Sequence, residues 1–385
     1  MSNRHSTLGT EGRLAAVGVR LPWPLPTAHC PFFTVASLMG AWLGLAVSAG
    51  AASNPGSAGN LSRFEFVETH MGSPFKIVLY STGAASARSA SRAALNRIAA
   101  LDAILSDYQP ESELSRLSAK AGGPPVAVSA DLFDVLRRSK DFYERSGRAF
   151  DVTIAPVGRL WRRARRERKL PAAETLARAR ALVGSDKMVL DPAKRTVQLT
   201  RRGMKLDVGG IAKGYAAQAA IDVLRQAGIT RALVGGAGDI VVGDPPPEAA
   251  GWTIGVASLN PAQSGPVLYL LLHNAAISTA GDAERFVIID GHRYSHIVNP
   301  ATGMGVEDRA SVTVVAPDGG TADALETAVY LMGPERGLKL IEETPGAAVL
   351  YRRLTEGGIR AFESSRFKEL PRTTPKDAAV SVSRP

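Results

Sequence analysis

Apolar residues recur at helical spacing in several stretches of the chain. In residues 86–108 they stand three residues apart at Leu95, Ile98 and Leu101, so this stretch is predicted to be an amphipathic helix. Residues 131–147 repeat the pattern and end in a glycine, which is typical of a helix C-terminus. Further helices are predicted over residues 213–228, 323–333 and 334–343.

Uncharged runs of aliphatic and β-branched residues lie between these helices and predict β-strands. A strand pair is expected over residues 231–243, and residues 346–352 are expected to form the final strand. Because strands and helices interleave, the predicted fold class is a mixed α/β (α+β) single domain, with no strand order implied. The other predicted strands are residues 252–257, 266–272, 285–290 and 311–316.

The N-terminal region has the pattern of a targeting segment. Residues 31–52 are uncharged, follow several arginines and end in small residues, which predicts a signal peptide cleaved near Ala51 or Ala52. A run of about 20 apolar residues is also long enough for an uncleaved membrane anchor. The single cysteine, Cys30, precedes this run and predicts neither a disulfide nor a lipid anchor. We therefore expect a periplasmic protein, either exported or tethered to the inner membrane.

Composition divides the rest of the chain into a linker, a domain and a tail. Residues 1–52 form the signal peptide or anchor, residues 53–63 are predicted to be a linker, and residues 64–367 an ordered domain. Residues 368–385 are predicted to be a disordered tail.

The net charge of +10 favours acidic partners such as phosphates, nucleotides or an anionic membrane surface. Residues 161–169 concentrate this charge, with five arginines and one lysine against one glutamate. The run is either a solvated helix or a surface that docks an acidic partner protein. No aromatic residues are interleaved in it as in a nucleic-acid site, so no nucleic-acid partner is predicted.

The stretch LDVGGIAKGYAAQAA, residues 206–220, combines a carboxylate, a glycine pair and a lysine where a helix begins. Backbone N–H groups at such a helix start bind phosphate, and Lys213 would add a full positive charge. Asp207 is suited to hold a metal ion or a ribose hydroxyl. Taken alone, the stretch is equally a strand-to-helix turn with a solvated lysine.

A second stretch points to a metal ion. Asp323 and Thr327 are four residues apart on a predicted helix and therefore share a face. All-oxygen ligands in small number suit Mg²⁺, which keeps waters and phosphate oxygens as its other ligands. The alternative is an acid at a helix start and a packed threonine. His292 and His296 have zinc-protease spacing, but no glutamate follows the first histidine, so no zinc site is predicted.

Eight stretches in a fixed order resemble the FAD:protein FMN transferase (ApbE) family, over residues 64–367. The resemblance implies a single α+β domain that binds FAD and Mg²⁺. It implies transfer of FMN from FAD to a threonine or serine hydroxyl of an exported or membrane-bound redox protein, with release of AMP. The stretches are residues 70–80, 101–118, 146–161, 206–218, 236–240, 277–286, 296–303 and 322–333.

The same resemblance implies roles for individual residues. His296 is implied as the catalytic group, with Asp282 as the other possible base and Thr279 beside it. The implied metal ligands are Asp323, Thr327 and the backbone carbonyl of Gly210. The residues implied to bind FAD are Met71, Tyr108, Ala149, Phe150, Asp151, Asp207, Lys213 and Ile297.

The chain departs from the family's pattern at four positions. Ala280 stands for a serine, Asn299 and Gln218 each stand for an aspartate, and Ala237 stands for a glycine. Ala280 and Asn299 lie nearest the inferred chemistry. They leave open a periplasmic FAD-binding protein, or an FAD pyrophosphatase without protein transfer, as the alternative function.

Overall fold

The computed structural model describes residues 61–259, 265–281 and 286–374. Contacts divide the chain into two units, Met1–Pro55 and Gly56–Pro385, and every described residue belongs to the second. The predicted signal peptide or anchor lies outside the described residues, as does most of the linker. Within the described ranges, no helix is both long enough and apolar enough to span a membrane.

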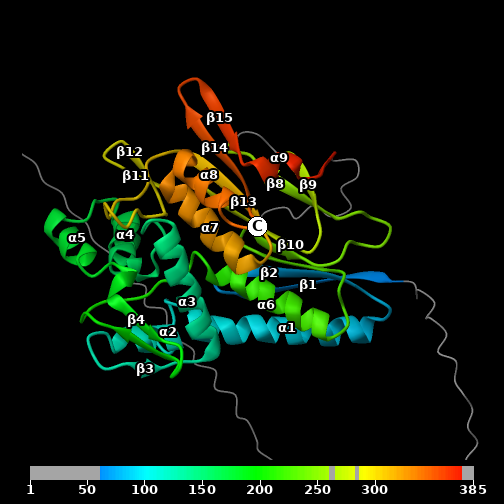
Figure 1. The fold of residues 1–385 in the computed structure, drawn as a ribbon, viewed down its shortest axis with the longest axis horizontal. Helices are drawn as coiled ribbons and strands as arrows, with labels where there is room; N and C mark the ends of the chain where they lie inside the picture. The colour runs from blue at the N-terminus through cyan, green and yellow to red at the C-terminus, as the bar shows by residue number, and fades with distance from the viewer. Residues whose placement is uncertain (1–60, 260–264, 282–285, 375–385) are drawn as a thin grey trace, which may run out of the picture. The chain divides into compact units, whose positions relative to one another are not determined.

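An eight-stranded antiparallel sheet is the scaffold of the second unit (Figure 1). Its strands follow one another in chain order across the sheet, and the other elements of the domain are inserted between them. In spatial order the strands are β1 (Ser62–His70), β2 (Ser73–Ser81), β6 (Ala232–Gly236), β7 (Asp239–Val242), β10 (Ala275–Gly281), β13 (Ala310–Ala316), β14 (Ala348–Thr355) and β15 (Gly358–Glu363).

Three helices cover one face of this sheet: α1 (Ala84–Leu105), α6 (Ala212–Gln226) and α7 (Gly319–Met332) (Figure 1). Strand β2 shows why this face is apolar. Phe75 and Ile77 point into the large core cluster with the helices, whereas Val78 points to the opposite face. Helix α7 is buried nearly all round, which explains its almost uninterrupted apolar sequence.

A second, three-stranded sheet covers the opposite face through the cluster of Trp252, Leu270 and Phe367. It contains β8 (Trp252–Ala257), β9 (Pro266–Leu272) and β16 (Arg372–Thr373), and the short helix α9 (Ser365–Glu369) precedes β16.

The tail was predicted to be disordered from residue 368, but α9 and β16 carry ordered structure to Thr373, so this starting point is wrong. The chain remains ordered because the backbone of Arg372 and Thr373 pairs with β9 and Arg372 bonds Glu363. Residues 375–385 lie outside the described residues.

The remaining elements lie around these helices. They are α2 (Glu113–Ala119), β3 (Val126–Ala127), α3 (Ala130–Arg145), η1 (Val152–Ile154), α4 (Ala155–Glu167), α5 (Ala173–Arg180), η2 (Ser185–Lys187), β4 (Met188–Asp191), β5 (Thr196–Leu199), β11 (Phe286–Ile289), β12 (His292–Ser295) and α8 (Pro334–Glu342). Helices α4 and α5 with β11 and β12 form a lobe around a small apolar cluster that includes Trp161 and Tyr294, whose ring centroids are 5.2 Å apart. Helix α8 packs instead on α7 and β14.

The predicted α+β fold class is confirmed, and each predicted helix and strand is present with boundaries shifted by a few residues. The glycine expected to end α3, Gly147, has the positive φ of 60° that this role requires. The prediction that residues 346–352 form the final strand is wrong, since β15 and β16 follow. The hairpin of β4 and β5 was not predicted, although β5 alternates polar and apolar residues, because each strand is only four residues long.

Two hairpin turns require backbone conformations that favour glycine. In the turn between β1 and β2, Met71 and Gly72 have φ of 50° and 70°. In the turn between β6 and β7, Ala237 and Gly238 have φ of 53° and 100°. Positive φ at both central residues is the pattern of the type I′ turn. A residue with a Cβ carries a cost of about 1–2 kcal/mol there.

Replacing Ala237 by glycine should therefore stabilise the protein, by about 0.5–1 kcal/mol after the larger unfolded-state entropy of glycine is counted. Urea denaturation measures the change. The matched control is Ala103→Gly on the exposed face of α1, which should cost about 1 kcal/mol. A loss of stability at both positions would contradict the strain assigned to the turn.

Candidate active site

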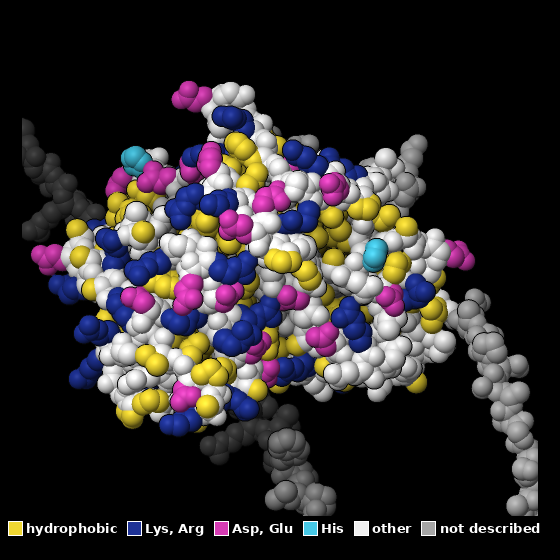
Figure 2. Space-filling view, viewed as in Figure 1, with side chains coloured by type: hydrophobic (Ala, Val, Ile, Leu, Met, Phe, Trp, Pro, Cys, Tyr) yellow, Lys and Arg dark blue, Asp and Glu magenta, His cyan; other side chains and the backbone are white. Residues whose placement is uncertain are grey.

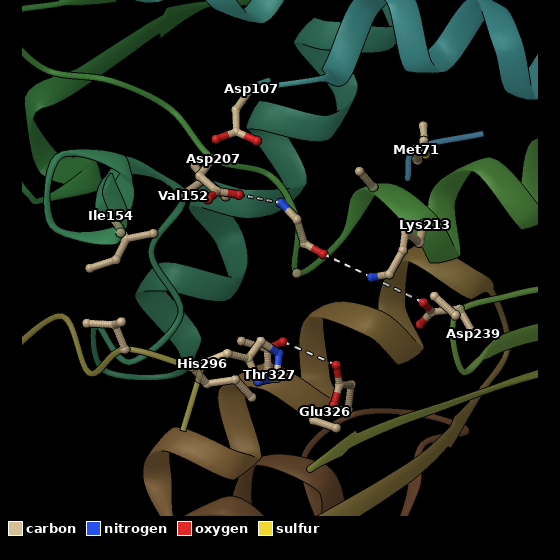
Figure 3. Close-up of a pocket in the computed structure, with 18 of the residues that line it drawn as sticks. Met71, Asp107, Val152, Ile154, Asp207, Lys213, Asp239, His296, Glu326 and Thr327 are labelled. Atoms are coloured by element: carbon tan, nitrogen blue, oxygen red, sulfur yellow. Dashed lines mark hydrogen bonds and ion pairs between the residues drawn. The ribbon is translucent and has the colours of Figure 1, made fainter. Parts of the chain in front are cut away.

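A cavity of about 800 Å³ opens where the turns of the large sheet meet α4, α6 and α7 (Figure 3). Its volume lies in the range of small-molecule sites. Asp282 lies outside the described residues, and Asp323 is buried without lining the cavity. The other predicted site residues all line it: Met71, Tyr108, Ala149, Phe150, Asp151, Asp207, Gly210, Lys213, Thr279, His296, Ile297 and Thr327.

Lys213 stands in the first turn of α6 and points into the cavity. Its Nζ lies 3.3 Å from Asp239 Oδ2 and donates to the carbonyl of Gly209 at 3.2 Å (Figure 3). Burial alone would lower the pKa of Lys213, but Asp239, Asp323 and Glu326 outweigh it and raise that pKa above its ordinary value. The ammonium group therefore remains charged at neutral pH.

Helix α7 places two carboxylates beside this lysine. Asp323 and Glu326 are 1% and 7% exposed, and Asp323 Oδ2 accepts a hydrogen bond from the backbone N–H of Gly214 at 2.9 Å. Burial and the nearby Asp239 raise the pKa of Asp323 to about 7. Burial and the charges of Asp323 and Asp239 also raise the pKa of Glu326 well above its ordinary value.

The free oxygens of these carboxylates are suited to a cation. Asp323 Oδ1 and Glu326 Oε2 are buried and have no hydrogen-bond partner. A buried oxygen without a partner is costly unless something binds it. The cluster also carries three carboxylates against the single charge of Lys213, and a divalent cation would balance that excess.

The proposed ligand set for Mg²⁺ converges at the same place. Thr327 follows Glu326 on α7, and Gly210 is so close that a Cβ added to it would lie 3.0 Å from Thr327 Oγ1. In the described ranges no three His, Cys, Asp or Glu side chains form a complete metal site. Mg²⁺ takes few protein carboxylates and completes its shell with phosphate and water, and the oxygens of Thr327, Gly210 and the neighbouring carboxylates are ligands of that kind. The residues present therefore fit that ion.

Asp207 lines the cavity and also fixes the glycine turn. Its Oδ1 accepts from the N–H of Gly209 at 2.9 Å, and its Oδ2 accepts from Arg162 at 3.1 Å. Arg162 also bonds Asp107 and lies 4.5 Å from the ring centroid of Tyr108. Burial and the neighbouring Asp107 raise the pKa of Asp207. Tyr108 is 75% exposed, so its other face is available to a ligand ring.

Asp151 lines the cavity, but its Oδ1 is occupied by hydrogen bonds within the protein. Its Oδ1 accepts from the N–H and hydroxyl of Thr153 and from the hydroxyl of Ser185, at 2.7–2.9 Å. It thereby caps η1 and shapes the wall formed by Ala149 and Phe150. On the opposite side, Asp102 accepts from the N–H of Met71 at 2.9 Å and holds the strained turn in place.

The segment after β12 brings His296 and Ile297 to the cavity. A backbone bridge between Val298 and Gly305 closes the loop that follows. On β10, Thr279 Oγ1 lies 3.0 Å from Thr313 Oγ1, so this hydroxyl is already engaged within the sheet.

Comparisons with known proteins bear on this geometry. A model of the ApbE family matches residues 71–351. The chain belongs to the ApbE family. The FAD:protein FMN transferase of Treponema pallidum is 31% identical over 314 residues, or 77% of this chain and 87% of that relative. The enzyme of the same name from Haemophilus influenzae is 31% identical over 280 residues, or 71% and 81%.

Solved structures of the family have the same fold. The flavin transferase ApbE from Vibrio cholerae superimposes with a TM-score of 0.74 at 27% identity, covering 80% of this chain and 99% of that one. The ApbE protein from Thermotoga maritima gives a TM-score of 0.72 at 28% identity, covering 81% and 100%. These comparisons confirm the family, the fold class and the transferase class of enzyme expected from the sequence.

Two departures from the ApbE pattern are conservative in this structure. Asn299 does not line the cavity, and its Oδ1 accepts from the N–H of Ala301 at 2.9 Å, as an aspartate oxygen would. Gln218 Oε1 accepts from the first N–H of α7, on Gly319, at 3.2 Å. Ala280 is different, because it lines the cavity and lacks the hydroxyl that the family carries there.

Sequence reasoning missed several charged residues of this ApbE site. Asp239 begins β7 within the stretch GAGDI, where an acid after a hairpin turn was a visible signal. Glu326 is the one glutamate within the apolar stretch of α7, and an acid in a buried helix is such a signal too. Arg162 was missed because the basic run 161–169 gives no sign of which arginine faces the site. Of this run only Trp161, Arg162 and Arg165 line the cavity.

Glu326→Gln should stabilise the metal-free protein, and more so at higher pH. Because the pKa of Glu326 is raised on folding, the native state holds a proton that the unfolded state loses, so wild-type stability falls as pH rises above the ordinary glutamate pKa. We expect a gain of the order of 1 kcal/mol at pH 8 and little at pH 5.

Urea denaturation in the presence of EDTA at both pH values measures this gain. The exposed Glu335→Gln on α8 is the control and should change stability by less than about 0.5 kcal/mol at either pH. An equal effect of Glu326→Gln at both pH values would contradict the raised pKa.

Proposed function

We propose that this chain is a Mg²⁺-dependent FAD:protein FMN transferase, which moves FMN from FAD to a threonine or serine hydroxyl of a target protein and releases AMP. The supporting observation is the wall of the cavity where the charged Lys213 meets buried carboxylate oxygens that have no partner. FAD is proposed as the substrate because the relatives are named FAD:protein FMN transferase.

The glycine turn and Lys213 are placed to hold the FAD pyrophosphate. Asp207 fixes the turn through the N–H of Gly209, and the Lys213 ammonium lines the cavity beside it in a fixed geometry. Donors fixed in advance stabilise the charge that develops on phosphate oxygens without reorganisation during the reaction. Tyr108 and Phe150 offer aromatic surface to the rings of FAD.

Asp323, Thr327 and the carbonyl of Gly210 would hold Mg²⁺. When bound, this ion neutralises the pyrophosphate and stabilises the departing AMP oxygen. Lys213 keeps the local excess of carboxylate charge from repelling the phosphates before the ion arrives.

His296 is placed to accept the proton of the target hydroxyl. The hydroxyl oxygen forms a bond to the FMN phosphorus while the bond from that phosphorus to the bridging oxygen of AMP breaks. The proton passes to the imidazole, and AMP leaves with the bridging oxygen. Asp282 stays a possible second base, and Thr279 is proposed to shape the cavity beside it.

The target is proposed to be an exported or membrane-bound redox protein. Residues 1–52 support this proposal, because their pattern is that of a signal peptide or an inner-membrane anchor. The acceptor reaction would then take place in the periplasm.

Incubating residues 53–385 with FAD, Mg²⁺ and acceptor peptides should give a peptide that has gained the mass of FMN, together with AMP, by mass spectrometry.

Asp323→Ala should lower the rate by at least ~10²-fold, as expected when a metal ligand is lost. Asp141→Ala, an exposed change on α3, is the control. AMP release at the wild-type rate in Asp323→Ala would remove the metal assignment. AMP and FMN without a modified peptide would favour the pyrophosphatase, to which Ala280 in the cavity wall already points.

His296→Ala should slow transfer about 10²–10⁴-fold while FAD still binds, because only the proton acceptor is lost. Transfer is followed by peptide mass and FAD binding by flavin fluorescence. The exposed His273→Ala, in the turn between β9 and β10, is the control. A wild-type rate in His296→Ala would exclude His296 from the mechanism.

A further inference from the structure

Glu326 is a buried carboxylate to which the proposed reaction assigns no role. It stands on α7 between the two proposed metal ligands Asp323 and Thr327, and it is 7% exposed. Unlike Asp323, it lines the cavity, and Figure 3 shows it beside Thr327 on the wall formed by α7. A carboxylate at this depth needs a partner, because burying a charge without one is costly.

The described residues supply a partner for only one of its oxygens. Glu326 Oε1 accepts a hydrogen bond from the hydroxyl of Thr327 at 3.3 Å, but Oε2 is buried and has no hydrogen-bond partner. Among the described residues, no Lys, Arg or His side chain forms an ion pair with Glu326, and the Lys213 ammonium pairs with Asp239 instead. Acids on the surface differ, since Figure 2 shows them scattered among Lys and Arg side chains and open to solvent.

The two neighbouring carboxylates are more fully engaged. Asp239 accepts from the hydroxyl of Ser278 at 2.5 Å and pairs with Lys213. Asp323 accepts from the N–H of Gly214 with one oxygen and lies behind the cavity wall. Glu326 is therefore the carboxylate of this cluster that combines an oxygen without a partner with a position in the wall.

The oxygens around Glu326 are spaced for one small cation. Neighbouring ligands of an octahedral ion with bonds of about 2.1 Å lie about 3 Å apart. The 3.3 Å between Glu326 Oε1 and Thr327 Oγ1 is close to this spacing. The backbone of Gly210 adjoins the same hydroxyl, since a Cβ added to Gly210 would lie 3.0 Å from Thr327 Oγ1. Side chains of α7 and the glycine turn before α6 thus meet at one point of the wall.

We propose that Glu326 is a further ligand of the Mg²⁺ ion and holds the ion in the cavity when no FAD phosphate is present. This inference rests on the proposed function, and it extends the proposed ligand set from one carboxylate to two. Sites for hard divalent cations are tuned by the number of charged ligands. With Asp323 alone, a strongly hydrated ion would depend on the phosphates of FAD. With Glu326 as well, the protein balances both charges of the ion.

The test measures metal binding by the purified chain with Mn²⁺, which suits the same oxygen ligands as Mg²⁺ and loses EPR intensity when it binds. Without FAD, the wild type should bind one Mn²⁺ ion that Mg²⁺ displaces. Glu326→Gln keeps the shape of the side chain but removes its charge, and it should raise the Kd for Mn²⁺ at least ~10-fold. With FAD present the increase should be smaller, since the phosphates supply other ligands.

Heat denaturation gives a second readout. Mg²⁺ should raise the Tm of the wild type, because a ligand that binds only the native state stabilises it. The Tm of Glu326→Gln should respond much less. The exposed Glu335→Gln on α8 is the matched control and should match the wild type in both experiments.

An unchanged Kd in Glu326→Gln would overturn the proposal, and so would a wild type that binds Mn²⁺ only when FAD is present. Asp323→Ala separates these results from a failure of the proposed function. If Asp323→Ala abolishes Mn²⁺ binding while Glu326→Gln does not, the metal site stands and only the role of Glu326 is lost. If the wild type binds no Mn²⁺ even with FAD, the Mg²⁺ site of the proposed function fails as well.

Discussion

The close approach of α6 to α7 is the constraint on which the site depends. A Cβ on Gly214 would lie 2.1 Å from the carbonyl oxygen of Gly319, and a Cβ on Gly319 would lie 2.1 Å from that of Gly214. Only two glycines allow the helix backbones to meet in this way. The contact lets Asp323 reach the N–H of Gly214, and it brings the carboxylates of α7 to the neighbouring Lys213. The glycine turn with Lys213 and the buried carboxylates are thus carried by two helices fixed against each other by backbone contact.

Burying the carboxylates of Asp323 and Glu326 lowers the free energy of unfolding, and packing in the rest of the fold offsets this loss. Two carboxylate oxygens without partners are retained in a helix that is otherwise apolar, and two hairpin turns hold residues at positive φ around the same cavity. Such features persist where the surrounding structure is rigid. Here the rigidity comes from a sheet whose two faces are both covered, by three helices on one side and a smaller sheet on the other.

Sequence patterns could predict the elements and the site positions, but not the direction of each side chain. Helical and strand periodicity is local, so α1, α3 and α6 were predictable within a few residues. The spacing of Asp323 and Thr327 correctly indicated one helix face, yet it could not show that Asp323 lies behind the cavity wall. Asp207 lines the cavity as predicted, but the sequence could not show that its carboxylate also accepts hydrogen bonds from Gly209 and Arg162. Gly209 is a local partner, but Arg162 lies 45 residues away in the chain, and no local pattern contains such a tertiary contact.

The two halves of the site rest on different scaffolds. Lys213 and the buried carboxylates are held by α6, α7 and the large sheet, whereas the loop that carries His296 is held by the lobe of α4 and α5. Trp161 of α4 donates its Nε1–H to the carbonyl of Gly303 at 2.7 Å, and Arg180 of α5 donates to that of Ala301. Both bonds fix the loop from the side away from α7. Lys213 and Asp323 stand instead on α6 and α7. A substitution in α5 can therefore shift the loop that carries His296 without altering the contact between α6 and α7.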